Sequence, residues 1–309
     1  MIKQAILIIA HNNFGTLEKI IECLDSDYFD LYVHIDLKSK NFNLEELSKI
    51  PKKSKIYIYN KYNVRWADFS QVECELFLLK QAVSNGIYTY FHLISGVDMP
   101  LKSPKAIYDF FEKNKGKEFV HFHTSEFPNY KYDWIKYYWV FRKFSRKSKI
   151  LYVLEYISIK IQKLFHINRI KNLEIKFMTG ANWFSITNDF VEYLLSQEDK
   201  FKKIFNHTRS ADEIFMQTVL YNSKFKKDLY YSKFDDNYIS CMRFIDWNRG
   251  NPYVFKITDY DDLVNSKYLF ARKFDENVDK EIISKLYENC LNRKLGEENE
   301  KSSTKSISK

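Results

Sequence analysis

Gln4-Ala-Ile-Leu-Ile-Ile-Ala10 is a short, continuous apolar run in which β-branched isoleucine dominates. A strand that is buried on both faces, as in a parallel sheet, has this composition. The run ends at His11-Asn12-Asn13, and apolar residues then recur at the spacing of one helix face, at Leu17, Ile20, Ile21 and Leu24. A buried strand followed by an amphipathic helix is the first unit of an α/β fold.

The same order of elements repeats along the chain. We expect further strands at 31–35, 55–59, 88–95 and 118–123, a strand–turn–strand at 176–186, and closing strands at 229–231 and 238–244. We expect helices at 70–84, after Ser103-Pro104, and at 188–196, 211–221 and 278–291. Strands that alternate with helices predict a mixed, mostly parallel sheet flanked by helices.

The domain organisation is predicted to be simple. The chain has 309 residues, and we assign 1–293 to a single domain. Tyrosine, tryptophan and basic residues dominate 130–165, which we interpret as a helical insertion over the sheet face. Residues 294–309 are polar and charged, and we expect a disordered tail there.

Composition and charge limit the possible functions. Hydrophobic residues make up 45% of the chain, which excludes a disordered protein. The formal net charge of +9 favours an anionic partner such as a nucleotide-sugar phosphate, an anionic membrane face or a nucleic acid. Part of the excess is a cluster at Arg142, Lys143, Arg146, Lys147 and Lys149. This cluster leaves open a second class of function, a non-enzymatic protein whose basic surface binds membrane or nucleic acid.

Cysteine use and hydropathy indicate the compartment. The four cysteines are far apart and form no Cys-x-x-Cys pair, so a zinc site is not expected and a reducing compartment is. We find neither a signal-peptide core nor an apolar run long enough to span a membrane. We therefore expect a cytoplasmic protein, with peripheral contact at the inner membrane face left open.

Polar residues stand where the predicted strands end. His11, Asp36, Asp98 and His123 occupy these positions, and ligands of open α/β sheets bind beyond the carboxyl ends of the strands. Asp36 can accept hydrogen bonds from ribose hydroxyls or a uracil edge. Each residue alone can instead cap the next helix. Glu126 follows the His123 strand and either contacts an acceptor hydroxyl or is a solvated loop carboxylate.

No glycine-rich phosphate loop is present, and no Asp-x-Asp pair follows an apolar strand to hold a metal against a diphosphate. A diphosphate bound without metal needs fixed cations. Arg249, Arg272 and Lys273 are the candidates, with a solvated basic surface as the alternative. Trp183 and Trp247 can stack on sugar rings or belong to the core.

Arg209-Ser210-Ala211-Asp212-Glu213-Ile214-Phe215 carries two adjacent carboxylates at a predicted helix start. Ser210 and Glu213 have the spacing of a capping box, in which Glu213 reaches back to the Ser210 backbone N–H. Alternatively, Glu213 is a general base that takes a proton from an acceptor hydroxyl.

Several stretches, in this order and spacing, resemble glycosyltransferase family 14, the core 2 and I-branching β-1,6-N-acetylglucosaminyltransferases and peptide O-xylosyltransferases. They are Ala10-His11, Val33-His-Ile-Asp-Leu-Lys-Ser39, Val64-Arg-Trp66, Leu93-Ile-Ser-Gly-Val-Asp-Met-Pro-Leu-Lys-Ser103, Thr179-Gly-Ala-Asn-Trp-Phe184, Ser210-Ala-Asp-Glu213, Phe244-Ile-Asp-Trp-Asn-Arg-Gly-Asn-Pro252 and Leu269-Phe-Ala-Arg-Lys-Phe-Asp275.

The resemblance implies a GT-A-like fold, a UDP-sugar donor, inversion at the anomeric carbon, and neither a metal nor another cofactor. It implies Glu213 as catalytic base and Lys273 as diphosphate ligand, accompanied by Arg249 or Arg272. Asp36 falls where the family contacts uridine, and we assign His11, Arg65, Asp98 and Trp183 to donor binding as well. Glu126 and Trp247 are our candidates for acceptor contact, which the resemblance does not supply.

The expected reaction is transfer of N-acetylglucosamine from UDP-GlcNAc to a glycan or glycolipid hydroxyl, with no nucleic-acid partner. Transfer from UDP-xylose is the alternative within enzymes. The xylosyltransferase branch carries an aspartate where this chain has Asn182, and a neutral amide cannot act as a base. This difference favours the N-acetylglucosaminyl branch.

Overall fold

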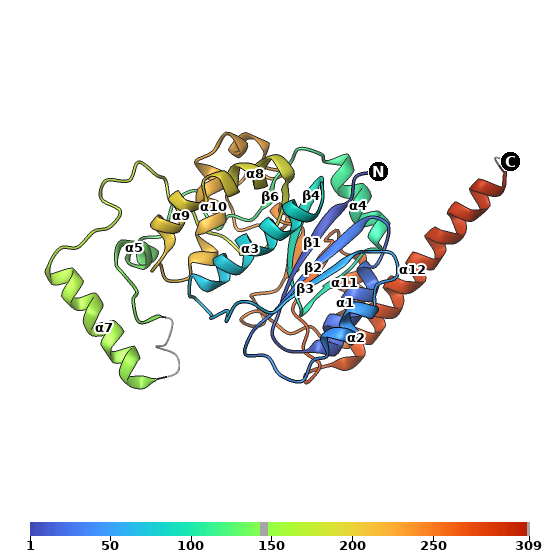
Figure 1. Cartoon of the computed structure of the whole chain (residues 1–309), viewed down its shortest axis with the longest axis horizontal. Coiled ribbons are helices and arrows are strands. Elements are labelled where there is room, and N and C mark those ends of the chain that lie inside the picture. Colours follow the sequence, from blue (N-terminus) through green and yellow to red (C-terminus); the bar gives the residue numbers. More distant parts are fainter. Residues whose placement is uncertain (143–147, 308–309) are drawn as a thin grey trace.

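The computed structural model describes residues 1–142 and 148–307, with side chains described as far as Glu297. Its main sheet has six strands in the order β3-β2-β1-β4-β7-β6, shown in Figure 1. The strands are β1 (Gln4–Ala10), β2 (Phe29–Ile35), β3 (Ile56–Tyr59), β4 (Tyr90–Ser95), β6 (Phe119–Val120) and β7 (Phe184–Thr187). The first four are parallel, whereas β7 is antiparallel to β4 and to β6. The predicted mixed, mostly parallel sheet is confirmed.

Strand β1 is the centre of the fold because its side chains enter two separate cores. Ala5 and Leu7 pack on one face with α3 (Ser70–Asn85), α8 (Asn188–Ser196), α9 (Glu198–Phe205) and α10 (Phe215–Tyr221). Ile6 and Ile8 pack on the other face with α1 (Phe14–Leu24), α4 (Pro104–Lys113), α11 (Tyr260–Asn265) and α12 (Lys280–Ile307). Short helix α2 (Leu44–Lys49) lies between β2 and β3 in the chain. The apolar run at 4–10 thus forms the doubly covered strand that its composition predicts.

A second sheet of three strands, β5 (Asp98–Pro100), β9 (Phe270–Arg272) and β8 (Arg243–Ile245), lies beside the first. The expectation that 229–231 and 238–244 close the main sheet is wrong. Residues 238–240 form a 3-10 turn, β8 pairs only with β9, and Leu229 makes a single bridge to Glu118. The register of β5 and β9 places Asp98 opposite Arg272.

The expected strand–turn–strand at 176–186 is present only in its second half, as β7. Before β7 the backbone bonds to other partners, because the Met178 N–H donates to the Thr218 side chain and the Gly180 N–H donates to the Glu213 carbonyl. Gly180 also approaches His121, the residue directly after β6, so closely that a Cβ would lie 1.9 Å from its carbonyl oxygen. The segment is therefore a packed loop between β6 and the turn that carries Glu213.

The insertion is helical as expected, with α5 (Asn129–Lys136) and α7 (Lys149–Leu164). Its predicted position over the sheet face is wrong, because α7 lies at the far edge of the molecule, well away from the sheet (Figure 1). Basic residues 143–147 of the predicted cluster fall outside the described part of the chain. At the other end, α12 continues to Ile307 where a disordered tail was expected from 294 onward. Among the described residues, no helix combines the length and the hydropathy needed to cross a bilayer.

Candidate active site

A cleft of about 1040 Å³ opens at the carboxyl ends of the parallel strands. His11 follows β1, Asp36 follows β2 and Ser95 ends β4, and all three line the cleft. Residues from distant parts of the chain complete it, among them Asn182, Glu213 and Arg272. The cleft therefore lies where ligands of open α/β sheets bind, and it brings together most residues that the sequence pointed to.

Glu213 does not take part in a capping box. Residues Ala211–Glu213 form a 3-10 turn ahead of α10, and Ser210 adopts a left-handed conformation with φ 49° and ψ 49° and makes no side-chain cap. The Glu213 N–H donates to the Ser210 carbonyl, and the Ser210 N–H donates to the Ala67 carbonyl. The Glu213 carboxylate therefore does not cap the helix, and it lines the cleft.

A buried lysine holds the Glu213 carboxylate in place. Lys131 Nζ lies 2.8 Å from Glu213 Oε2 and 2.9 Å from Thr179 Oγ1. The Lys131 side chain is 5% exposed, whereas that of Glu213 is 37% exposed. The sequence analysis did not identify Lys131 as the partner of Glu213. Its spacing was a usable signal, since Phe127, Lys131 and Ile135 recur four residues apart and all are buried.

Two further carboxyl groups, those of Asp212 and Glu75, lie near Glu213. Burial raises the pKa of Asp212 to about 7, and the negative charge of Glu213 acts in the same direction. Glu75 on α3 is buried, and burial together with the charge of Asp212 raises its pKa well above the ordinary range. In both Asp212 and Glu75, burial therefore favours the protonated form of the carboxyl group.

The cation best placed in the cleft is Arg272. Its Nη1 lies 2.7 Å from Asp98 Oδ1, and its guanidinium carbon lies 4.4 Å from the centroid of the Trp183 ring. Asp98 itself is buried and also accepts hydrogen bonds from the Ser95 N–H and Oγ–H. Buried Asp98 therefore fixes the orientation of Arg272, and both Arg272 and Trp183 line the cleft.

The other two predicted cations differ from Arg272. Lys273 does not line the cleft but lies close enough for its charge to lower the pKa of His11, after the larger effect of burial. Arg249 also lies outside the lining and is held by two carboxylates, those of Asp246 and Asp259, the latter at 2.6 Å. Its charge is thus balanced locally, which makes it less suited to meet a diphosphate than Arg272.

The donor-side residues Asp36 and Arg65 both line the cleft. Asp36 is buried, and its two oxygens accept the Lys38 and Val64 N–H groups at 2.8 Å each. These bonds tie the loop after β2 to the loop after β3. Lys38 also lines the cleft and donates from Nζ to the Val64 carbonyl at 2.7 Å, which adds a cation that the sequence analysis did not single out.

Of the two predicted acceptor residues, only Trp247 lines the cleft, where its Nε1 donates to the Tyr238 hydroxyl at 2.6 Å. Glu126 is exposed and is not part of the lining. The structure instead places His123 and Asp236 in this wall, with His123 Nδ1 2.6 Å from Asp236 Oδ1. More than a hundred residues separate the two in sequence, so only the fold reveals the pair.

His121, His123 and Asp236 together form the one group among the described residues whose donor atoms could hold a metal ion. His123 and Asp236 are hydrogen-bonded to each other, whereas buried His121 Nε2 makes no hydrogen bond within the described part of the chain. Ala181 N–H donates to His121 Nδ1, which leaves the hydrogen of a neutral ring on Nε2, 3.2 Å from Asp236 Oδ1. The two histidines lower the pKa of Asp236 to about 2. The cluster thus combines a hydrogen-bonded pair, His123 with Asp236, and an imidazole nitrogen on His121 that has no hydrogen-bond partner among the residues described.

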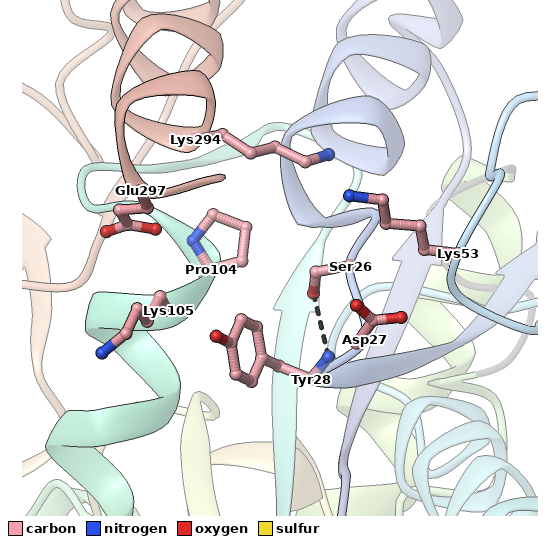
Figure 2. Close-up of a pocket in the computed structure, with 8 residues that line it drawn as sticks. All are labelled: Ser26, Asp27, Tyr28, Lys53, Pro104, Lys105, Lys294 and Glu297. Carbon is pink, nitrogen blue, oxygen red and sulfur yellow. Dashed lines mark hydrogen bonds between the residues drawn. The ribbon is translucent and has the colours of Figure 1, made fainter. Parts of the chain in front are cut away.

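A smaller pocket of about 260 Å³ lies at the opposite edge of the sheet, before β2 and β3 (Figure 2). Figure 2 shows Lys53 and Lys294 pointing toward one another across its rim, with Glu297 and Lys105 on the other side. None of the predicted site residues lies there.

The fold and the cleft define an α/β protein with a polar ligand site at the carboxyl ends of its parallel strands. The model of the Core-2/I-Branching enzyme family matches residues 5–263. The chain therefore belongs to this family, as the ordered sequence stretches indicated.

The similar proteins include transferases of two kinds. Xylosyltransferase sqv-6 of Caenorhabditis briggsae is 25% identical over 275 residues, which cover 82% of this chain and 32% of the relative. A β-1,3-galactosyl-O-glycosyl-glycoprotein β-1,6-N-acetylglucosaminyltransferase of Bos taurus is 23% identical over 314 residues, which cover 93% of this chain and 69% of the relative. The chain thus spans about a third of the first relative and about two thirds of the second.

Among solved structures, the chain is similar to the apo form of glycosyltransferase GlyE of Streptococcus pneumoniae, with a TM-score of 0.46 and 10% identity over 96% of this chain and 64% of that one. It is also similar to apo mouse xyloside xylosyltransferase 1, with a TM-score of 0.38 and 10% identity over 87% of this chain and 97% of that one.

Proposed function

We propose that this chain is an inverting glycosyltransferase that moves N-acetylglucosamine from UDP-GlcNAc to a hydroxyl group of a glycan acceptor without a metal ion. The observation that carries the proposal is that one cleft is lined by both a carboxylate, Glu213, and a guanidinium group, Arg272. Membership of the Core-2/I-Branching enzyme family and the transferase names of its relatives support the reaction class.

In the proposed reaction, the acceptor oxygen attacks C1 of the donor sugar while Glu213 takes the hydroxyl proton. The bond from C1 to the diphosphate oxygen breaks, and UDP leaves with the electron pair. Arg272, held by Asp98, meets the charge that develops on the diphosphate, and Lys273 adds a second cation nearby. A single displacement of this kind inverts the anomeric carbon.

Lys131 has a positioning role in this scheme. It fixes Oε2 of Glu213 at 2.8 Å and balances its charge from a buried position, so that the carboxylate is oriented before the acceptor arrives. On the donor side, Asp36 anchors the loops around the proposed uridine site through two backbone amides. Trp183, stacked under Arg272, offers an apolar face to the donor sugar.

Transfer of xylose is the second candidate, and the similarity to a xylosyltransferase favours it. Against it stands Asn182, a neutral amide in the cleft lining where the xylosyltransferase branch has an aspartate. With Asn182 unable to act as a base, Glu213 is the better candidate, as in the N-acetylglucosaminyl branch.

The test is a binding screen of the purified chain with UDP, UDP-GlcNAc, UDP-xylose and GDP-mannose, read by thermal shift and calorimetry. We expect UDP and UDP-GlcNAc to stabilise the protein, because a ligand that binds only the folded state raises its melting temperature. A response to UDP-xylose but not to UDP-GlcNAc would select the second candidate. Absence of any UDP binding, together with salt-dependent binding of a polynucleotide, would favour the basic-surface class instead.

A further inference from the structure

Helix α7 buries two polar residues, Glu155 and Gln162, beside a single apolar one, Ile159, and exposes most of its other apolar residues. Glu155 and Gln162 are buried, and Gln162 exchanges two hydrogen bonds with the Tyr138 backbone, at 2.8 and 2.9 Å. Glu155 lies 3.6 Å from Arg142. These polar contacts attach α7 to the rest of the insertion and leave its apolar side outward.

The outward side is a continuous apolar stripe. At 100° per residue its members fall within about a third of the helix circumference, and their exposed fractions run from 40% to 73%. The stripe consists of Ile150, Val153, Leu154, Ile157, Ile161 and Leu164. Phe165, directly after the helix, is 72% exposed and extends it. Apolar residues that are scattered singly over a surface need no explanation, but a contiguous stripe of this kind marks an interaction site.

Charge identifies the partner. Lys149, Lys160 and Lys163 are exposed and lie together along one flank of the stripe at this helical spacing, with Tyr152 and Tyr156 among them. Lys160 Nζ lies 4.7 Å from the centroid of the Tyr156 ring. An apolar face bordered by lysines and by amphipathic aromatic rings is typical of a helix that lies in the plane of an anionic membrane surface.

Two other occupants fit less well. A bilayer-spanning role does not suit α7, which has 16 residues and is polar on one side. A second copy of the chain would bring two positively charged flanks near each other in a two-fold interface, whereas anionic lipid headgroups neutralise them.

We propose that the outer face of α7 is a docking surface for an anionic lipid bilayer, with the apolar stripe inserted at the boundary between headgroups and acyl chains. Arg142 links this surface to the cleft, because it pairs with Glu155 of α7 and also lines the cleft. Docking therefore places the cleft close to the membrane. As a second step that rests on the proposed transferase function, the acceptor is a glycan carried by a lipid in that membrane.

The test is flotation of the full chain with vesicles of phosphatidylcholine alone or mixed equally with phosphatidylglycerol. We expect flotation with the anionic vesicles and a loss of binding at high salt. The double variant Ile157→Glu/Ile161→Glu should bind at least roughly tenfold more weakly, because two aliphatic side chains leave the interface. Both residues are exposed, so the variant should keep the melting temperature of the wild type.

The matched control is Ile2→Glu/Ile87→Glu, which adds the same two charges at exposed isoleucines away from α7. It should float like the wild type. Replacing Lys149 and Lys160 by glutamine should weaken binding to anionic vesicles by roughly fivefold per lysine. Lys163 is kept because it already pairs with Asp133.

The proposal is overturned if the wild type fails to float, if the stripe variant floats as well as its control, or if neutral vesicles bind equally well. It is also overturned if the wild type is a dimer that the stripe variant dissolves, without binding to vesicles. None of these readouts depends on UDP binding or sugar transfer, so failure of docking and failure of the proposed reaction are distinguishable.

Discussion

Asp212→Asn tests the electrostatics behind Glu213 without touching the proposed base. The pKa of Asp212 is raised from 3.8 to about 7, chiefly by burial and then by the charge of Glu213. A shift of about three pKa units corresponds to about 4 kcal/mol, taken as an upper bound because the cleft admits water. The folded state keeps the Asp212 proton up to about pH 7, whereas the unfolded chain releases it near pH 4. The contribution of Asp212 to the free energy of unfolding therefore falls as pH rises between these values.

The assay is urea unfolding of wild type and Asp212→Asn at about pH 5 and about pH 8. Asparagine does not titrate between these pH values, so any constant cost of the substitution cancels when the two free energies of the variant are compared. We expect the variant to gain up to about 3 kcal/mol relative to wild type on going from the lower to the higher pH, which is less than the full shift because the unfolded chain has already released most of this proton at about pH 5. A matched substitution at exposed Asp199 on α9 should show no such gain. If the difference between Asp212→Asn and wild type is the same at both pH values, the reasoning about the buried carboxyl pair is refuted.

Three further outcomes follow from the site. Gly180→Ala should lower the melting temperature by several degrees, because the added Cβ would overlap the His121 carbonyl. The control Gly296→Ala on α12 places its Cβ in open space and should be neutral or stabilising. Equal effects of the two variants in a thermal scan would contradict the close approach of Gly180 to His121. Arg272→Ala should weaken UDP binding by roughly tenfold or more in calorimetry. Arg249→Ala should change UDP binding little, since Arg249 is held by two carboxylates. A larger loss of UDP affinity in Arg249→Ala than in Arg272→Ala would exchange the proposed roles of the two arginines. Turnover should survive excess EDTA, and loss of activity that Mn²⁺ restores would make the histidine–aspartate cluster a ligand set.

The parts of the fold that sequence predicts best are those in which one local pattern dominates. Strand β1 spans Gln4–Ala10 as its apolar run indicates, and α8 spans Asn188–Ser196 as expected. The run at 4–10 is apolar on both faces, so both faces must be buried. This requirement predicts parallel strands beside it and a layer of helices on each face of the sheet. Strand-end residues such as His11 and Asp36 then reach the cleft because the topology aligns the carboxyl ends.

The errors arise where long-range contacts override a local signal. Ser210 and Glu213 have the spacing of a capping box, but Lys131 binds the Glu213 carboxylate and Ser210 is left-handed. The Lys131 pair joins segments 82 residues apart, which no local pattern encodes. In the same way, the His123–Asp236 contact depends on how the loop before β8 folds back over the main sheet.

The predicted position of the insertion was wrong for a different reason. The abundance of tyrosine, tryptophan and basic residues at 130–165 was interpreted as a helical segment over the sheet face, since the apolar side of a helix normally faces a core. In α7 that side is exposed, and buried Glu155 and Gln162 attach the helix through polar contacts instead. Periodicity reveals an apolar face but does not reveal what covers it.

The measurement that bears most directly on the central claim is the turnover of Glu213→Gln with UDP-GlcNAc and a glycan acceptor, alongside its affinity for UDP. We predict a kcat lower by roughly 10²–10⁴, with the Kd for UDP and the melting temperature close to those of wild type, because glutamine retains an oxygen for Lys131 but cannot accept the acceptor proton. A variant that turns over at the rate of wild type would contradict Glu213 as the base and, with it, the proposed mechanism.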